Sequence, residues 1–452
     1  MEFKIKNILN HNFSNKFKDS LGLLILLTLI FSMFAHTIGD NENSRFDTTI
    51  SLVEEKKLSI DRIHNNTGDK SIINGTYYSD KAPLPSFLAV PGYALVSSQF
   101  NETVKNKSYS DSFRRSHSQK MEWGRFAATV TVSALAGALT SIIFYLFSIN
   151  LGLRRNESIF IGFLMGLTTL VFPYSTTFHG TMLGTLFLIS AVYLWFREDF
   201  NASSRSTALI GLLLGLGVSS SYLIVIPGGI LLTINSLERI EDIRLHLFGL
   251  FGLFTGLLPL LIFNYLTTGN LLDLTMFYSI DPYPNHAIDG YLFEISISKI
   301  KIARAVRALI SPLNGLFIYC PILIFGLVGL RNFYRNKKKL LFLVSGTLVV
   351  TLILTSFIVL WPIRAYYGPR YLLPASSLLI LPLIYEYKNS KKFEKALIYL
   401  TGIISSIIML ASTQTWSGSS WINPRGIHSI KMVSFGIYEN RVWDYLMSLP
   451  TE

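Results

Sequence analysis

The sequence predicts an all-α polytopic membrane protein, and three observations lead to this fold class. Half of the 452 residues are hydrophobic, only 15% are charged, and the mean hydropathy is +0.41. A soluble domain carries about 25% charged residues. Long apolar runs recur along the chain, and about 20 such residues cross a bilayer. The net charge of +12 comes from residues clustered in short segments between the runs, a pattern typical of membrane topology rather than of a nucleic-acid surface.

The apolar runs predict about eleven transmembrane helices. The first run follows a lysine-rich tail and lacks a small-residue cleavage site, so we interpret it as an uncleaved helix rather than a signal peptide. The predicted spans are residues 20–38, 124–149, 157–173, 178–196, 207–220, 222–236, 246–266, 311–330, 340–361, 371–386 and 396–413. We expect a helical hairpin at 207–236, broken near the serines at 219–221, because one long span would place all later basic loops outside.

Lysine and arginine in the short loops place the N-terminal tail, residues 1–19, in the cytoplasm. The transmembrane domain, 20–413, then carries two large outer loops, 39–123 and 267–310, and the tail 414–452 is also outside. Such long loops are usually functional or disordered.

Interfacial helices are expected in the first outer loop. The apolar stretch Leu84–Phe100 is interrupted by prolines, and we predict that it lies at the membrane surface. Phe46, Ile50 and Val53 have helical spacing, which predicts an amphipathic helix lying on the membrane.

Acidic residues directly after the first span are the candidates for chemistry. Asp40, Glu42 and Asp47 are expected where a lipid head group and a soluble acceptor meet. A carboxylate there can accept the proton of an attacking hydroxyl. The alternative is that these acids are simply solvated at a helix end.

The rest of the loop has a characteristic order. Arg45 follows the acids, and Tyr77-Tyr78-Ser79-Asp80-Lys81-Ala82-Pro83-Leu84-Pro85 comes later. This order resembles the first outer loop of the GT-C membrane glycosyltransferases, and it is closest to the branch related to protein O-mannosyltransferases and lipid A aminoarabinose transferases. The segments 211–218, 264–270 and 362–374 also resemble elements of that family, in the same order.

The resemblance implies a role for individual residues. Asp40 or Glu42 takes the place of the family's acidic motif, and Arg45 matches its arginine. The residues that match the later stretch are Tyr78, Asp80, Lys81 and Pro83. The family's acids are usually adjacent, whereas Asn41 separates them here, so the choice of base stays open, with Asp47 as a third candidate.

Further candidates lie later in the chain. Arg364, Tyr367 and Arg370 are expected at the outer mouth of two adjoining spans, where guanidinium groups can grip a phosphate, unless they only reach lipid head groups or a loop carboxylate. His179 opens the fourth span as a substrate contact or a helix cap. The basic series in the second loop either attracts anionic lipid or draws in a lipid-phosphate donor; it consists of Lys299, Lys301, Arg304 and Arg307.

The resemblance implies an inverting hexosyltransferase at the outer face of the cell membrane. It would move a sugar from a polyprenyl- or dolichyl-phosphate donor to a hydroxyl of a protein, lipid or glycan, with Lys81, Arg364 and Arg370 stabilising the departing phosphate. No cofactor is implied, and a divalent metal remains open. The alternatives are a lipid or glycan transporter or flippase without covalent chemistry, a ligase using lipid-diphosphate donors, and a structural membrane subunit.

Overall fold

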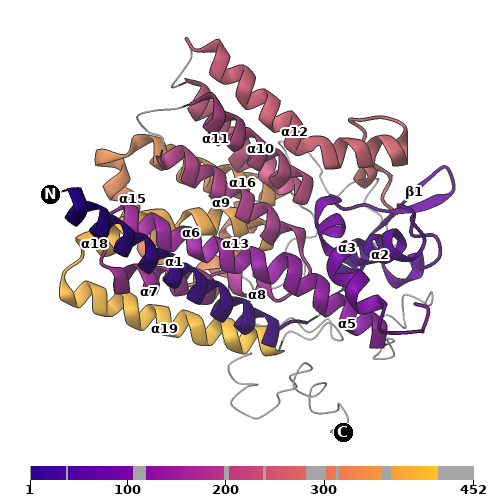
Figure 1. The fold of residues 1–452 in the computed structure, drawn as a ribbon, viewed down its shortest axis with the longest axis horizontal. Coiled ribbons are helices and arrows are strands. Elements are labelled where there is room, and N and C mark those ends of the chain that lie inside the picture. The colour runs from indigo at the N-terminus through magenta and orange to yellow at the C-terminus, as the bar shows by residue number, and fades with distance from the viewer. Residues whose placement is uncertain are drawn as a thin grey trace, which may run out of the picture.

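The computed structural model describes residues 2–36, 39–104, 119–197, 203–237, 241–280, 302–311, 315–357 and 368–415. It is 79% helical. Figure 1 shows long helices lying side by side, with the N-terminus at one end and α2, α3 and β1 at the other. The elements in chain order are α1 (Glu2–Met33), α2 (Asp40–Glu54), η1 (His64–Asn66), β1 (Lys70–Ile73), β2 (Thr76–Ser79), α3 (Leu84–Ser97), α5 (Gln119–Ala128), the π-helical turn η2 (Thr129–Ala134), α6 (Leu135–Asn150), α7 (Arg155–Thr168), α8 (Val171–Ser175), α9 (Gly180–Arg197), α10 (Ser204–Ser220), η3 (Tyr222–Ile224), α11 (Val225–Leu237), α12 (Ile243–Thr268), η4 (Thr275–Tyr278), α13 (Ile302–Ile310), α14 (Leu316–Tyr319), α15 (Leu323–Asn336), α16 (Lys338–Phe357), η7 (Arg370–Leu372), α17 (Leu373–Leu378), α18 (Ile380–Asn389) and α19 (Lys392–Thr415).

Within the described residues, five helices are long and apolar enough to cross a membrane. They are Gln119–Asn150, Gly180–Arg197, Ile243–Thr268, Lys338–Ser356 and Lys392–Ala411. Each of these helices begins within five residues of the start of a predicted span. The membrane character is therefore supported, while the count of eleven spans stays a prediction.

The predicted hairpin and two other spans show where helices break. α10 ends at Ser220, and Ser221 adopts an extended backbone before η3 begins, as the run of serines predicted. The predicted span 311–330 is divided within the described residues: α14 ends at Tyr319 and α15 begins at Leu323, with Pro321 between them. Proline lacks the N–H group that a continuous helix needs. The predicted span 371–386 is likewise divided into η7, α17 and α18.

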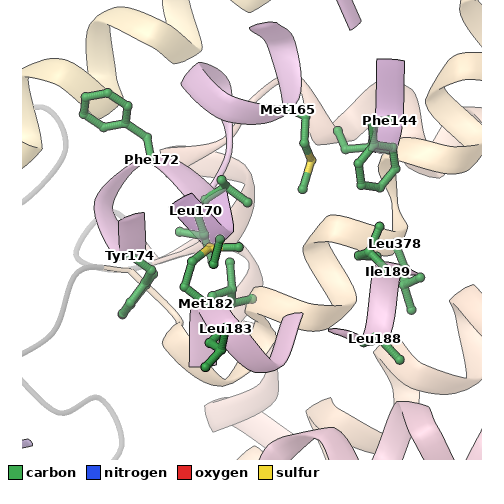
Figure 2. Packing of buried hydrophobic residues seen from close by; sticks show 14 of the residues in the cluster. Phe144, Met165, Leu170, Phe172, Tyr174, Met182, Leu183, Leu188, Ile189 and Leu378 are labelled. Atoms are coloured by element: carbon green, nitrogen blue, oxygen red, sulfur yellow. The ribbon is translucent and has the colours of Figure 1, made fainter. Parts of the chain in front are cut away.

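A shared apolar core holds the helices together. Figure 2 shows Phe144 of α6, Met165 of α7, Tyr174 of α8 and Ile189 of α9 within it. These side chains are fully buried, as is Leu378 of α17, far along the chain. The core therefore joins early and late helices around α9.

Residues 39–104 form a compact unit, which we call the first-loop lobe. α2 packs on α3 and on β2, α3 packs on α5, and β1 pairs with β2 in an antiparallel hairpin. Phe46 and Ile50 are fully buried, and the Phe46 ring packs edge-on against Tyr93. The apolar face of α2 therefore contacts protein, and the prediction that it lies on the membrane is wrong because α3 and α5 cover it.

The start of the second predicted loop joins the first. The Ile280 N–H donates to the Lys70 carbonyl over 3.0 Å, and the Ser71 hydroxyl donates to the Thr275 carbonyl over 2.7 Å. Residues 275–280 thus extend the edge of the hairpin. Two segments about 200 positions apart in the sequence are therefore hydrogen-bonded to each other.

α10 and α12 approach each other closely through glycines. A Cβ atom added at Gly252 would lie 1.9 Å from the Ala208 carbonyl oxygen, and one at Gly211 would lie 2.1 Å from the Gly249 carbonyl oxygen. Small residues at such crossings let helix backbones touch in a membrane. Since α12 packs mainly on α10, these glycines hold the helix that leads into the second loop.

We predict that Gly252→Ala lowers the thermal midpoint of the detergent-solubilised protein. Overpacking at a tight contact typically costs about 1–3 kcal/mol. The matched control is Gly402→Ala in α19, where an added Cβ meets nothing within 4 Å. Alanine favours a helix by about 1 kcal/mol over glycine, so the control should be neutral or stabilising. Equal midpoints for the two variants would contradict the close packing of α10 and α12.

Candidate active site

Glu42 is fixed at the beginning of α2. One of its carboxylate oxygens, Oε2, accepts a hydrogen bond from the Gly39 N–H over 3.1 Å, while Oε1 is buried and has no hydrogen-bond partner among the described residues. A carboxylate in the first turn of a helix is favoured by the helix dipole. Cap geometry therefore sets the position of this acid and leaves one oxygen available to a hydroxyl.

Arg45 lies one turn further along α2. Its guanidinium group donates to the carbonyl and the side-chain oxygen of Asn41, and the Asn41 amide donates to Asp69 over 3.4 Å. Gly180, the first residue of α9, leaves room for the Arg45 side chain because it has no side chain of its own. A Cβ atom added at Gly180 would lie 3.1 Å from the Arg45 Nε and 2.4 Å from the Ser220 carbonyl oxygen. α2, α9 and the end of α10 therefore meet at this arginine.

Lys81 is held between two carboxylates. Its ammonium group lies 2.8 Å from Asp69 and 3.0 Å from Asp80. Asp80 also accepts hydrogen bonds from Ser44 and Ser279 over 3.4 and 3.2 Å. Burial opposes the charge of this lysine, but the two carboxylates outweigh burial and raise its pKa.

Arg370 and His179 reach the same place from distant parts of the chain. The positive charges of Arg45, Arg370 and Lys81 act on the imidazole of His179. Three cations that act on one ring lie close together. The Arg370 guanidinium also lies 4.8 Å from the Tyr371 ring and donates to its hydroxyl.

We call this group of side chains the charged cluster. Its members interact electrostatically with one another across α2, the hairpin, the start of α9 and η7. They are Glu42, Arg45, Asp69, Asp80, Lys81, His179 and Arg370. Three carboxyl groups and three cations are thus gathered at one end of the bundle.

The structure separates the three candidate acids. Asp40 accepts a hydrogen bond from the Gly68 N–H over 2.8 Å, so it fastens the loop before the hairpin to α2. Asp47 is fully buried, with Asn66 donating to it over 3.4 Å and Arg125 nearby. Glu42 has Arg45 and Arg370 as its principal positive neighbours, whereas Asp47 has Arg125 and Lys70.

Burial perturbs two of these acids strongly. It raises the pKa of Glu42 to about 7, although a hydrogen bond from the Glu42 backbone and the charge of Arg45 oppose this shift. It raises the pKa of Asp47 to about 8, against the opposing charge of Arg125. A base is most effective when its pKa is near the working pH, which fits Glu42. Asp47 is mainly protonated at neutral pH.

The remaining predicted residues are placed as follows. Tyr78 lies on β2, where burial and the charge of Asp61 raise its pKa; Asp61 is not a member of the charged cluster. Arg304 lies on α13 and donates to the Ser356 carbonyl over 3.3 Å. Arg364, Tyr367, Lys299, Lys301 and the tail from 416 lie outside the described residues.

Two participants were missed by sequence reasoning: Asp69 pairs with Lys81, and Arg125 lies close to Asp47. Tyr222, which the sequence suggested as a cavity-lining residue or a partner of freed backbone groups, lies near Asp80 and Arg45. Asp69 follows Thr67 and Gly68, an ordinary turn signal in the sequence. What distinguishes it is its place directly before the hairpin, whose second strand ends next to Lys81. Tyr222 directly follows the serine break that the sequence did identify.

Among the described residues, no three side chains of the kinds His, Cys, Asp or Glu gather as a metal site. In the charged cluster, a metal cation would have to compete with one ammonium and two guanidinium groups for the carboxylates. The arrangement therefore suits an anion, such as a phosphate, beside a proton acceptor.

We predict that Asp47→Asn removes a pH-dependent loss of stability. In the unfolded chain Asp47 ionises near pH 4, whereas in the folded chain it holds its proton up to about pH 8. Stability therefore falls as the pH rises between these values, by at most about 1.4 kcal/mol for each pH unit. The thermal midpoint of the variant relative to the native protein should rise from pH 5 to pH 8. A difference that does not change with pH would contradict a buried, protonated Asp47.

Comparisons with known proteins show similarity in fold but not in sequence. No family model matches the chain, and no curated protein does. The crystal structure of ArnT from Cupriavidus metallidurans in the apo state is similar, with a TM-score of 0.53 and 12% identity over 86% of this chain and 63% of that chain. The structure of the same protein bound to undecaprenyl phosphate gives a TM-score of 0.53 and 11% identity over 91% of this chain and 74% of that chain.

At this identity the likeness shows the fold alone. The chain spans about 63% of the ArnT chain in the first comparison, so the fold is shared over a shorter length. ArnT is a GT-C glycosyltransferase. The chain therefore shares an ArnT-like fold, whereas the specific branch that the first loop predicted is not shown.

Proposed function

We propose that the protein is a membrane glycosyltransferase that uses a polyprenyl-phosphate sugar as donor. The observation that carries this proposal is the charged cluster, in which a carboxylate of pKa about 7 lies beside Arg45 and Arg370, close to Lys81. This transfer needs cationic groups that bind the donor phosphate and a carboxylate that accepts the proton. The ArnT structure bound to undecaprenyl phosphate supports the donor class.

In the proposed reaction, Glu42 is the general base. The acceptor hydroxyl attacks the anomeric carbon of the sugar and gives its proton to Glu42, while the bond from that carbon to the phosphate oxygen breaks. The polyprenyl phosphate leaves with the electron pair, and the configuration at the sugar inverts. Because phosphate is already a fair leaving group, the protein mainly positions the reactants, removes the proton and neutralises charge.

Three cations are proposed to bind the phosphate. Lys81 presents a point charge held by Asp69 and Asp80, while Arg45 and Arg370 offer planar groups that suit phosphate oxygens. His179 lies among these cations and can donate a hydrogen bond to a phosphate oxygen. Arg364 and Tyr367, from the same late segment as Arg370, remain proposed donor contacts.

Tyr222 and Thr275 are proposed to contact the sugar. Both hydroxyls are buried and interact with each other, but among the described residues neither makes a hydrogen bond of normal geometry. Tyr222 also lies near Asp80 and Arg45. A poorly paired buried hydroxyl costs free energy, and a sugar hydroxyl would supply a better partner.

The proposed topology keeps the predicted arrangement of eleven spans, with residues 1–19 in the cytoplasm and the tail 414–452 outside. The loops 39–123 and 267–310 then carry the site at the outer surface. This agrees with the hydrogen bonds between residues 70–71 and 275–280, which bring the two loops together. The acceptor is a hydroxyl of a protein, lipid or glycan.

The first test is transfer from a polyprenyl-phosphate hexose by the purified protein. We predict that Glu42→Gln lowers kcat by about 10²–10⁴-fold, the usual contribution of a general base. Asp40→Asn and Asp47→Asn are matched controls, because each removes a carboxylate of the same helix while keeping an acceptor oxygen. Loss of turnover in Asp47→Asn but not in Glu42→Gln would reverse the assignment. A native protein inactive on every such donor would contradict the function itself.

A second prediction concerns Tyr222. The change Tyr222→Phe removes one hydroxyl and should raise KM for the donor about fivefold, since one hydrogen bond contributes about 1 kcal/mol. The thermal midpoint should not fall. Tyr265→Phe, at a side chain that is 58% exposed on α12, is the control. An unchanged KM for Tyr222→Phe would remove this residue from the site.

A further inference from the structure

The second loop ends in a short helix whose two sides differ. α13 runs from Ile302 to Ile310, and Ile302, Val306 and Ile310 are 72%, 46% and 58% exposed. With 3.6 residues per turn, these three side chains lie within an arc of about 80°. Ala308, on the opposite side of the helix, is fully buried. We call the three exposed residues the apolar stripe of α13.

The buried side of α13 packs on the end of α16. The Arg304 guanidinium donates to the Ser356 carbonyl over 3.3 Å, and α13 packs on α16 and α14. Ser356 lies in the last turn of α16, where carbonyl groups lack partners within the helix and a cation is favoured. Arg304 therefore attaches α13 to the end of α16.

The attachment places α13 near the end of a candidate membrane span. The segment Lys338–Ser356 is long and apolar enough to cross a membrane, and in the proposed topology it ends at the outer side. Ile353, three residues before Ser356, is 48% exposed. Both helices therefore leave apolar side chains exposed close to the place where they pack together. The apolar stripe continues the exposed apolar surface of α16.

The length of α13 decides how it can meet a membrane. Its nine residues extend about 13 Å, whereas the hydrocarbon core is about 30 Å thick, so α13 does not cross it. Branched aliphatic side chains are unfavourable in water. A short helix with one apolar side instead lies in the plane of the membrane surface, with that side among the acyl chains. Arg307 is exposed beside the stripe, and its long side chain can extend to lipid phosphates.

We propose that α13 is an interfacial helix whose apolar stripe inserts among the acyl chains of the outer leaflet. The insertion anchors the end of the second loop. The beginning of that loop is held by the hydrogen bonds of Thr275 and Ile280 to the hairpin. The membrane and the first-loop lobe thus hold the loop from its two ends. This inference does not depend on the reaction proposed at the charged cluster.

The test measures the surroundings of a nitroxide spin label at Val306→Cys in vesicles of phosphatidylglycerol and phosphatidylcholine. The native Cys320 is buried, and the labelled native protein gives the background. Oxygen dissolves in acyl chains and a polar nickel chelate does not. The ratio of oxygen to nickel accessibility should therefore be about tenfold higher at 306 than at Lys57→Cys, an exposed position of the first-loop lobe. Val349→Cys, 52% exposed on α16, is the control for a side chain in lipid.

A label at Arg307→Cys provides a comparison on the same helix. Its position is rotated by about 100° from that of Val306, so its ratio should lie between those at 306 and at Lys57. Ile310→Cys repeats the measurement within the stripe, and the thermal midpoint checks that each labelled variant is folded.

Three results would overturn the proposal. A nickel accessibility at 306 equal to that at Lys57 would place the stripe in water. Low accessibility to both reagents, with dipolar broadening between labels, would place a second copy of the chain on the stripe. Low accessibility to both without broadening would show that another segment of this chain covers it.

Discussion

Lys81 lies 2.8 Å from Asp69 and 3.0 Å from Asp80, and only 17% of its side chain is exposed. The two acids flank the hairpin, and they also accept hydrogen bonds from Asn41 of α2 and Ser279 of the second loop. Removing one member of a buried ion pair costs about 3–5 kcal/mol, because the other charge is left without a partner. One ammonium group therefore fixes where α2, the hairpin and the second loop meet, and the positions of the other charges follow from that meeting.

The same helix supports two acids with different surroundings. Glu42 is capped by a backbone N–H and lies among arginines, whereas Asp47 is enclosed with Asn66 and Arg125. Five residues along a helix correspond to a rotation of about 140°, so the two carboxyl groups leave α2 in different directions. Environment therefore divides their roles: Glu42 can exchange a proton near neutral pH, and Asp47 holds its proton as part of the packing of α2 against α5.

Local signals in the sequence predicted the local features well. The serines at 219–221 marked the break after α10, and the stretch from Tyr78 to Pro83 marked the lobe that carries Lys81. Contacts between distant segments had no such signal. The pairing of Lys81 with Asp69, the approach of Arg370, and the hydrogen bond from Ile280 to Lys70 depend on tertiary packing. The apolar face of α2 was assigned to lipid for the same reason, since helical spacing does not say what covers a face.

The most direct measurement is an experimental structure of the protein with a polyprenyl phosphate in a lipid nanodisc. The account predicts that the phosphate lies within hydrogen-bonding distance of Lys81 and Arg370, with the Glu42 carboxylate facing the position of the transferred sugar. A phosphate bound elsewhere, with Lys81 still enclosed by Asp69 and Asp80 and no room beside Glu42, would contradict the proposed active site while leaving the fold unchanged.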